Sequence, residues 1–256
     1  MSTVQDVLQF IESIAPPSLK MEGDNVGLLC GRADKEVKTI LVALDPFVSV
    51  CREAVAENAD LLVTHHPIIH GTISSVTDQT TYGQALLELM EHNISAVNAH
   101  TNLDCADGGV NDTLAKAVGL SDIQKIAADP YGLLRLGQAD NQPLEVFLAT
   151  VKKNLGCEGL RYTNGGKDVR KVAVGGGSCG SELAAVAAAG CDTFVTADVK
   201  YNQFWDAKML GINMIDAGHF HTENPVVAVL AEKIQAAFPQ IQVKISKNHT
   251  DCMKFY

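Results

Sequence analysis

Short apolar runs alternate with stretches of helical periodicity along most of this chain of 256 residues. The apolar runs are rich in branched residues, which favour buried strands. Predicted strands cover residues 39–44, 60–63, 94–97, 133–136, 160–162, 171–174, 193–196, 212–215 and 242–245. Predicted helices cover residues 4–14, 47–58, 82–92, 110–118, 144–154, 182–189, 203–210 and 226–238. This alternation predicts α/β architecture, with mainly parallel or mixed sheets flanked by helices.

Three segments that carry histidine and acidic residues each follow one of these apolar runs. They are Thr64-His65-His66-Pro67, His100-Thr101-Asn102-Leu103-Asp104 and the stretch from Gly218 through His219 to Glu223. Ligands of open parallel sheets collect beyond the carboxyl ends of the strands. The shared placement therefore predicts that these segments meet at one rim and form a metal site.

The residue types in these segments suit a particular class of metal. Pro67 favours a turn after the strand, which allows the adjacent His65 and His66 to turn toward neighbouring ions. His219 and Glu223 are four residues apart, so one helical turn puts them on a common face. Imidazole and carboxylate ligands suit zinc, manganese or iron better than calcium. Two such ions about 3.5–4 Å apart would share a water and lower its pKa.

Several of these residues also have a structural interpretation. Asp104 could begin a turn, and Glu223 could favour the N-terminus of the helix that follows it. His70 and His100 could each be a metal ligand, could orient a ligand or could donate to a substrate. His92 and His249 are interpreted first as loop residues that form hydrogen bonds.

The seven cysteines are scattered and include no C-x-x-C pair, which argues against a disulfide framework or a structural zinc site. We expect most of them to be buried apolar residues of a protein in a reducing cytoplasm. Cys105 is the exception to watch because it follows Asp104 directly.

Charge and hydropathy exclude two classes of partner. The formal net charge of −10 argues against nucleic acid, because nonspecific binding to phosphates needs a basic face. No apolar run is long enough to cross a bilayer, and the N-terminus lacks the pattern of a signal peptide. We therefore expect a soluble, cytoplasmic protein.

A glycine run, Gly175-Gly176-Gly177-Ser178-Cys179-Gly180, satisfies G-x-G-x-x-G after a predicted strand, and Asp198 ends the next strand. This is the outline of a dinucleotide site. In a glycine-rich tract in mid-chain, a tight turn or an anion-binding nest near the metal is the favoured interpretation.

The motifs occur in an order that resembles one family. They are Asp24-Asn25-Val26-Gly27-Leu28, Ala43-Leu44-Asp45, the three segments above, Gly175-Gly176-Gly177-Ser178 and Thr196-Ala197-Asp198-Val199-Lys200-Tyr201. Together they resemble the GTP cyclohydrolase I type 2 homologues, the NGG-interacting-factor-like family, over nearly the whole chain.

The resemblance implies two α/β domains with a dinuclear metal centre in the cleft between them. It implies a discontinuous first domain, residues 1–128 with 222–256, around a second domain, residues 129–221. It also implies a ring-shaped homohexamer with metal sites facing an internal cavity. The implied metal ligands are His65, His66, Asp104, His219 and Glu223.

The chain departs from the family pattern at three positions. Asn202 follows Lys200-Tyr201 where histidine is usual, Asp198 replaces the more common glutamate, and His221 adds an imidazole. The first two departures put a catalytic role for the segment around Asp198 in question, and the third is expected to bring an extra imidazole to the site.

Three functional hypotheses follow. The first is a metal-dependent hydrolase of a nucleotide or phosphoester, with two zinc, manganese or iron ions per chain and with His100 or His221 as catalytic proton carrier. The second is a hexameric metal-binding scaffold or regulator without catalysis. The third is an oxidoreductase that uses the glycine run for a dinucleotide.

Overall fold

The computed structural model describes residues 1–256 and divides the chain into two compact units. The first unit comprises Met1–Asp107 and Val227–Thr250, and the second comprises Gly108–Val226 and Asp251–Tyr256. The boundaries differ from the predicted 128/129 and 221/222. Residues 108–128 join the second unit because β5 (Ser121–Lys125) pairs antiparallel with β6 (Arg135–Gln142).

The first unit is built on a five-stranded sheet of order β1-β4-β3-β2-β11. Its strands are β1 (Gly27–Cys30), β2 (Thr39–Ala43), β3 (Leu61–Thr64), β4 (Ser95–Asn98) and β11 (Gln242–Ile245). All neighbours are parallel except the edge strand β1, which runs antiparallel to β4. Since the parallel strands end together, the residues that follow them share one rim of the sheet.

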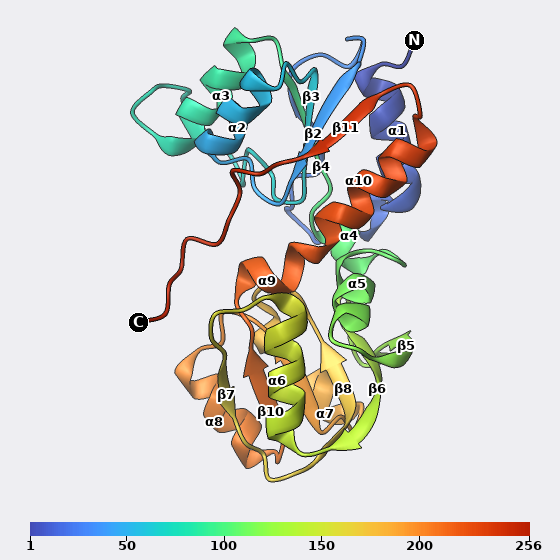
Figure 1. Ribbon diagram of the computed structural model, residues 1–256, viewed down its shortest axis with the longest axis vertical. Helices are drawn as coiled ribbons and strands as arrows, with labels where there is room; N and C mark the ends of the chain where they lie inside the picture. The colour runs from blue at the N-terminus through green and yellow to red at the C-terminus, as the bar shows by residue number, and fades with distance from the viewer. The chain divides into compact units, whose positions relative to one another are not determined.

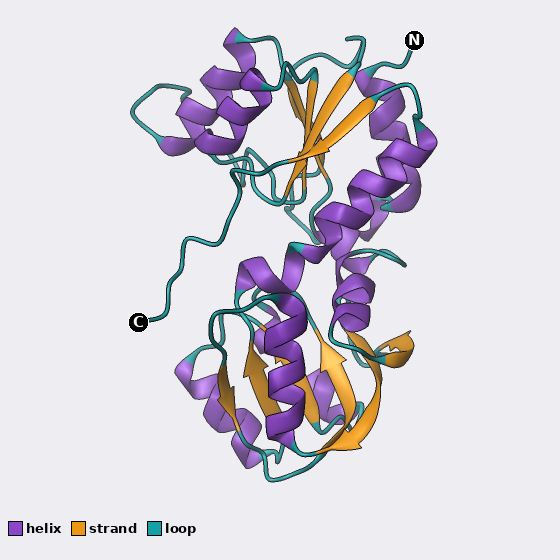
Figure 2. Cartoon of the chain, in the orientation of Figure 1, coloured by secondary structure: helices purple, strands orange, loops and turns teal.

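Helices cover both faces of this sheet (Figures 1 and 2), with α2 (Val48–Ala56) and α3 (Thr81–Glu91) on one face and α1 (Val4–Ile14) and α10 (Pro225–Ala237) on the other. The side chains of α2 and α3 pack with Leu41, Leu62 and Ala96 of the sheet in one apolar core. Two short helices complete the unit, η1 (Pro17–Leu19) and α4 (Thr101–Cys105). The apolar faces of the helices thus hold the strand ends in a rigid frame.

The second unit has a six-stranded sheet of order β5-β6-β8-β9-β10-β7. Its remaining strands are β7 (Arg161–Thr163), β8 (Val169–Val174), β9 (Thr193–Thr196) and β10 (Asn213–Asp216). The central β8, β9 and β10 are parallel, and the other pairings are antiparallel. The segments after the three parallel strands again share one rim.

Helices also cover both faces of the second sheet. The helices α5 (Val110–Ala117) and α6 (Leu144–Leu155) pack on one face with Val172 and Val174, while α7 (Leu183–Ala188) and α8 (Tyr201–Met209) pack on the other with Phe194. The short helices are η2 (Cys179–Glu182) and α9 (His219–Glu223). The predicted α/β class, with sheets flanked by helices, is confirmed.

Most predicted elements are present within one or two residues of their expected bounds. Six elements were not predicted as such: the strands β1 and β5 and the short helices η1, η2, α4 and α9. The strand expected at residues 133–136 begins at Arg135 and continues to Gln142, because it pairs with β8 as far as Val169. No helix is long and apolar enough to cross a membrane.

The cysteines are unbridged, and five of the seven are buried. Burial raises the pKa of the Cys51 thiol to about 12 and the pKa values of Cys157 and Cys191 to about 11. Such thiols are unreactive at neutral pH. Cys105 is also buried, in α4, and Cys252 is exposed.

Candidate metal centre

Three imidazoles cluster at the rim of the first sheet. His65 and His66 follow β3, and His100 follows β4. One ring nitrogen from each histidine lies within 4.8 Å of those of the other two. Ring centroids are 4.8 Å apart for His65 and His66, 5.2 Å for His65 and His100, and 5.5 Å for His66 and His100. The three rings can therefore point at one small ion.

The strand register explains this meeting. Ala43 of β2 pairs with Thr64 of β3, and Thr64 pairs with Asn98 of β4. Asp45, His66 and His100 are each the second residue after one of these aligned positions. Parallel pairing thus carries three segments, distant in sequence, to one line at the strand ends.

Each imidazole of this cluster is anchored through its Nδ1 atom. The acceptors are the Ala99 carbonyl for His65 (2.9 Å), Asp45 Oδ1 for His66 (2.7 Å) and Asp24 Oδ1 for His100 (2.8 Å). An oxygen acceptor requires that Nδ1 carry the proton. In the neutral ring the lone pair is then on Nε2, which is the arrangement of metal-binding histidines.

Asp104 adds a carboxylate to the cluster. It lies on α4, where only 8% of its surface is exposed, and its Oδ1 is 3.6 Å from Nε2 of His65. His65 itself is 1% exposed. The backbone N–H of Asp104 donates to the carbonyl of His100, so the first turn of α4 sets the spacing of these two residues. A buried carboxylate beside a buried imidazole is stable when a cation is shared between them.

Asp45 is a common acceptor for two histidines. Its Oδ1 binds His66, and its Oδ2 is 2.8 Å from Nε2 of His249. Burial would raise the pKa of the Asp45 carboxyl, but the hydrogen bonds and charges of His249 and His66 outweigh burial and hold that pKa well below its usual value. The ionised carboxylate therefore fixes the His66 ring and increases its basicity toward a metal.

The other acceptor, Asp24, is held in the same way. Its Oδ2 accepts from the hydroxyl of Thr101 and, at 3.1 Å, from the Thr101 backbone N–H. Burial would raise the pKa of Asp24, but the hydrogen bonds from Thr101 and His100 lower it below the usual value. His100 is thus oriented by a carboxylate that is itself fixed by the start of α4.

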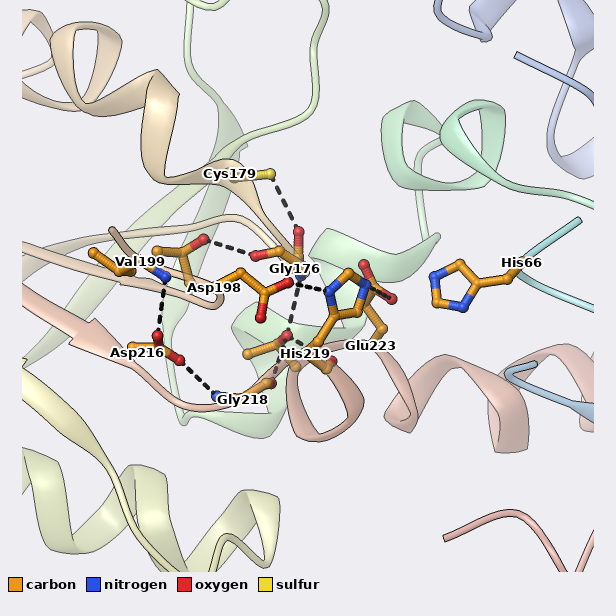
Figure 3. Close-up of polar contacts among 12 residues, drawn as sticks. His66, Gly176, Cys179, Asp198, Val199, Asp216, Gly218, His219 and Glu223 are labelled. Atoms are coloured by element: carbon orange, nitrogen blue, oxygen red, sulfur yellow. Dashed lines mark hydrogen bonds and ion pairs between the residues drawn. The ribbon is translucent and has the colours of Figure 1, made fainter. Parts of the chain in front are cut away.

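The second unit supplies a separate pair, His219 and Glu223, on α9. Nε2 of His219 is 3.0 Å from Oε2 of Glu223, one helical turn away, and Nδ1 of His219 is 2.7 Å from Oδ2 of Asp198. Figure 3 shows the His219 ring with Asp198 on one side and Glu223 on the other. The predicted common face is confirmed, and His219 follows the same Nδ1 pattern as the first cluster.

Asp216, at the end of β10, bonds to the two segments that carry Asp198 and His219. Its carboxylate accepts from the backbone N–H groups of Val199 and Gly218, both at 3.0 Å (Figure 3). Asp198 has a positive φ of 50°. These bonds stabilise the turn that directs the Asp198 carboxylate to His219.

The glycine run packs directly against the pair. The N–H of Gly176 donates to Oδ1 of Asn111 (2.7 Å), and that of Gly177 donates to the hydroxyl of Thr222 (3.1 Å). A Cβ on Gly177 would lie 2.2 Å from Oε1 of Glu223. Glycine is therefore needed here for the close approach of a carboxylate, and these amides are already bonded, which counts against the dinucleotide interpretation.

The remaining candidates have other partners. The ring nitrogens of His221 contact the Leu155 carbonyl (3.1 Å) and Oδ2 of Asp251 (3.2 Å). Nδ1 of His92 contacts the Glu88 carbonyl at 2.9 Å. His249, expected in a loop, is the second partner of Asp45. Imidazole nitrogens and carboxylate oxygens together form a donor set that fits zinc, manganese or iron.

The pattern of a family described as Duf34/NIF3 (NGG1p interacting factor 3) matches residues 2–252. The chain belongs to the Duf34/NIF3 family.

Curated relatives of similar length carry one name, "GTP cyclohydrolase 1 type 2 homolog". The protein of this name from Clostridium perfringens is 33% identical over 260 residues, which covers 98% of this chain and 99% of the relative. The one from Clostridium acetobutylicum is 32% identical, with 98% of each chain covered.

Two solved structures resemble this chain over nearly its whole length. Reduced HcgD from Methanocaldococcus jannaschii is 31% identical, with a TM-score of 0.83 and coverage of 96% of this chain and 98% of that one. A Bacillus cereus protein related to NIF3 has a TM-score of 0.94 at 24% identity, covering 100% and 99% of the two chains, which shows the shared fold.

Sequence reasoning missed the carboxylates that orient the histidines in this Duf34/NIF3 chain. Asp24 and Asp45 were noted only as parts of motifs, and Asp198 only as part of a motif, as the end of a strand after the glycine run and as a departure from the family pattern. The available signal was an aspartate just past a strand that borders a histidine-bearing strand, as with Asp45 after β2. Their individual partners depend on the sheet register.

Replacement of Asp45 by asparagine tests the role of these carboxylates. Asp45→Asn keeps the shape but removes the charge and leaves one oxygen for two histidines. We expect metal affinity to fall about 10–100-fold, measured by competition with a chelating dye. Asp34→Asn, at an exposed position, makes the same change in charge and should leave affinity unaltered. Equal affinity for both variants would contradict the orienting role.

Proposed function

We propose that this chain is a metal-dependent hydrolase of a nucleotide or phosphoester. In this proposal His65, His66, Asp104, His219 and Glu223 hold two divalent ions per chain, of zinc, manganese or iron. The observation that carries the proposal is the shared anchoring of the histidines at Nδ1, with Nε2 of His65 beside Asp104 and Nε2 of His219 beside Glu223. The nucleotide class comes from the name of the relatives.

The proposed ions and the residues around them have separate roles. When bound, two divalent ions supply a water of lowered pKa and a Lewis acid for the substrate oxygen. Asp45 and Asp198 keep His66 and His219 in the required tautomer. Their fixed orientation lowers the reorganisation needed during the reaction.

His100 is our preferred proton carrier. Asp24 holds its Nδ1, so Nε2 exchanges a proton beside His65 and His66. His221 is less suited to be the proton carrier, because its two ring nitrogens already contact Leu155 and Asp251. One ring nitrogen of His100 also lies within 4.8 Å of those of His65 and His66. The alternative role for His100 is therefore that of a further metal ligand.

A panel of substrates tests the hydrolase proposal. We expect the protein loaded with zinc, manganese or iron to hydrolyse at least one member of a set of nucleoside triphosphates, nucleoside monophosphates and p-nitrophenyl phosphate. Chelation should abolish the activity, and the same ion should restore it. Full metal loading with no turnover of any member would contradict the proposal.

The second candidate is a hexameric metal-binding scaffold, and one surface favours self-association. Tyr201, Trp205 and Met209 of α8 are 79%, 50% and 83% exposed and recur every four residues along one side of the helix. A stripe of large exposed apolar side chains is typical of an interface. We propose a ring-shaped homohexamer, located in the cytoplasm, for either function.

The two candidates differ in their response to chelation. The scaffold predicts that removal of metal dissociates the oligomer, because the metal serves assembly. The hydrolase predicts that turnover is lost while the sedimentation coefficient stays constant. Sedimentation velocity with and without chelator, with turnover measured on the same samples, distinguishes the two.

A further inference from the structure

A cavity of about 400 Å³ opens in the first unit beside the imidazole cluster. Three segments line it: residues 45–48 after β2, residues 66–74 after β3, and residues 81–85 at the start of α3. Its volume lies within the usual range for a small-molecule site, roughly 300–1,000 Å³. The cavity is therefore large enough for one ring system with a substituent.

The cavity reaches the proposed metal ligands. His66 and its partner Asp45 both line the cavity. His70, also in the lining, has its ring centroid 6.2 Å from that of His100. A molecule in this cavity would thus lie against the same histidines that the proposed function assigns to the metal and to proton transfer.

Two aromatic side chains give the cavity flat apolar surfaces. Phe47 is 59% exposed, and Tyr82 is half-buried at the start of α3. The Phe47 ring stacks on His249, with centroids 5.7 Å apart and an angle of 29° between the planes, and His249 in turn binds Asp45. An exposed aromatic ring that is already held in place can stack on a ligand at little entropic cost.

The lining holds few charged side chains. No lysine or arginine lines the cavity, and its one carboxylate is Asp45. The lining therefore offers a phosphate no lysine or arginine to pair with. The hydroxyls of Thr72, Ser74 and Thr81 instead supply neutral hydrogen-bond donors and acceptors. The lining thus favours an uncharged ring with polar edges.

We propose that this cavity binds an uncharged planar heterocycle of nucleobase size, with its face on Phe47 and its polar edges toward the hydroxyls of Thr72, Ser74 and Thr81. The inference rests on the proposed function in one respect: it names the part of the substrate that this site recognises. The phosphate of such a substrate would lie outside the cavity.

Binding of adenosine to the metal-loaded protein tests this inference without turnover of a phosphoester. By calorimetry we expect Phe47→Ala to weaken adenosine binding about tenfold, the cost of one lost stacking contact. Phe47→Tyr keeps the ring and should bind like the wild type. Tyr162→Ala removes another exposed aromatic side chain, on β7, and should have no effect. Ribose 5-phosphate, which lacks the base, should show no dependence on Phe47.

Two results would overturn the inference: adenosine affinity that is equal in the wild type and Phe47→Ala, or ribose 5-phosphate binding that Phe47→Ala weakens. Its failure is distinguishable from failure of the hydrolase proposal. If the protein hydrolyses a phosphoester and Phe47→Ala leaves the KM unchanged, the inference about the cavity fails and the hydrolase proposal stands. If adenosine binding depends on Phe47 but the protein turns over no substrate, the hydrolase proposal fails and the inference about the cavity stands.

Discussion

Asp104→Ala is expected to remove at least one metal ion per chain and to reduce metal-dependent hydrolysis more than about 100-fold. Loss of a residue that only orients a ligand reduces affinity or activity by up to about 100-fold, and loss of a ligand itself should cost more. The physical reason is the position of this buried carboxylate, 3.6 Å from Nε2 of the buried His65. Without it, a divalent ion near His65 loses an anionic ligand in a region of low dielectric. Elemental analysis and the substrate panel measure the two effects.

Two further variants make the Asp104 result specific. Asp104→Asn keeps the volume of the side chain and should lose metal as Asp104→Ala does, which separates lost charge from a packing defect. Asp34→Ala removes an exposed carboxylate and should change neither quantity. Thermal unfolding of each variant checks that the fold is retained. Unchanged metal content and unchanged hydrolysis in Asp104→Ala would remove this residue from the ligand set.

Gly177→Ala is expected to have the second large effect, although it adds a single methyl group. The new Cβ would lie 2.2 Å from Oε1 of Glu223 and 3.1 Å from Nε2 of His219. Glu223 is buried, so its carboxylate has little room to move without displacing His219. We expect metal affinity to fall more than about tenfold, as for a displaced ligand or outer partner, measured by the same dye competition.

Gly190→Ala is the matched control for this substitution. Gly190 has a φ of 70°, close to the 61° of Gly177, but a Cβ there would have no neighbour within 4 Å. Both variants carry the left-handed backbone penalty of about 1–2 kcal/mol, and only Gly177→Ala adds the collision. Equal metal affinity in the two variants would show that Gly177 does not control the position of Glu223.

Part of the arrangement of ligand-type residues could be predicted from local patterns. The segments after β3 and β4 share one rim, but the third segment, Gly218–Glu223, follows β10 of the other sheet, so the expectation that all three follow strands of one sheet was wrong. His65 and His66 follow an apolar run, and parallel strands place such positions at one edge. The pairing of His219 with Glu223 follows from helical geometry alone. The carboxylates that anchor the rings could not be found in this way, since Asp45 meets His66 only through the pairing of β2 with β3, and Asp24 meets His100 across 76 residues of sequence.

Several of the elements that were not predicted were missed for specific physical reasons. The edge strand β5 has the sequence Ser-Asp-Ile-Gln-Lys, which lacks an apolar run because most of its side chains are exposed. The helices α4 and α9 have five residues each, too few for a periodic pattern. The two compact units differ from the predicted domains for the first of these reasons, because β5 ties residues 108–128 to the second unit.

The number of metal ions per chain tests the central claim most directly. We would measure it by elemental analysis of protein purified without chelator and without a metal-binding affinity tag. The account predicts a value near two, with zinc, manganese or iron as the main element. A value near zero that persists after incubation with each of these three ions would contradict the assignment of His65, His66, Asp104, His219 and Glu223 as ligands.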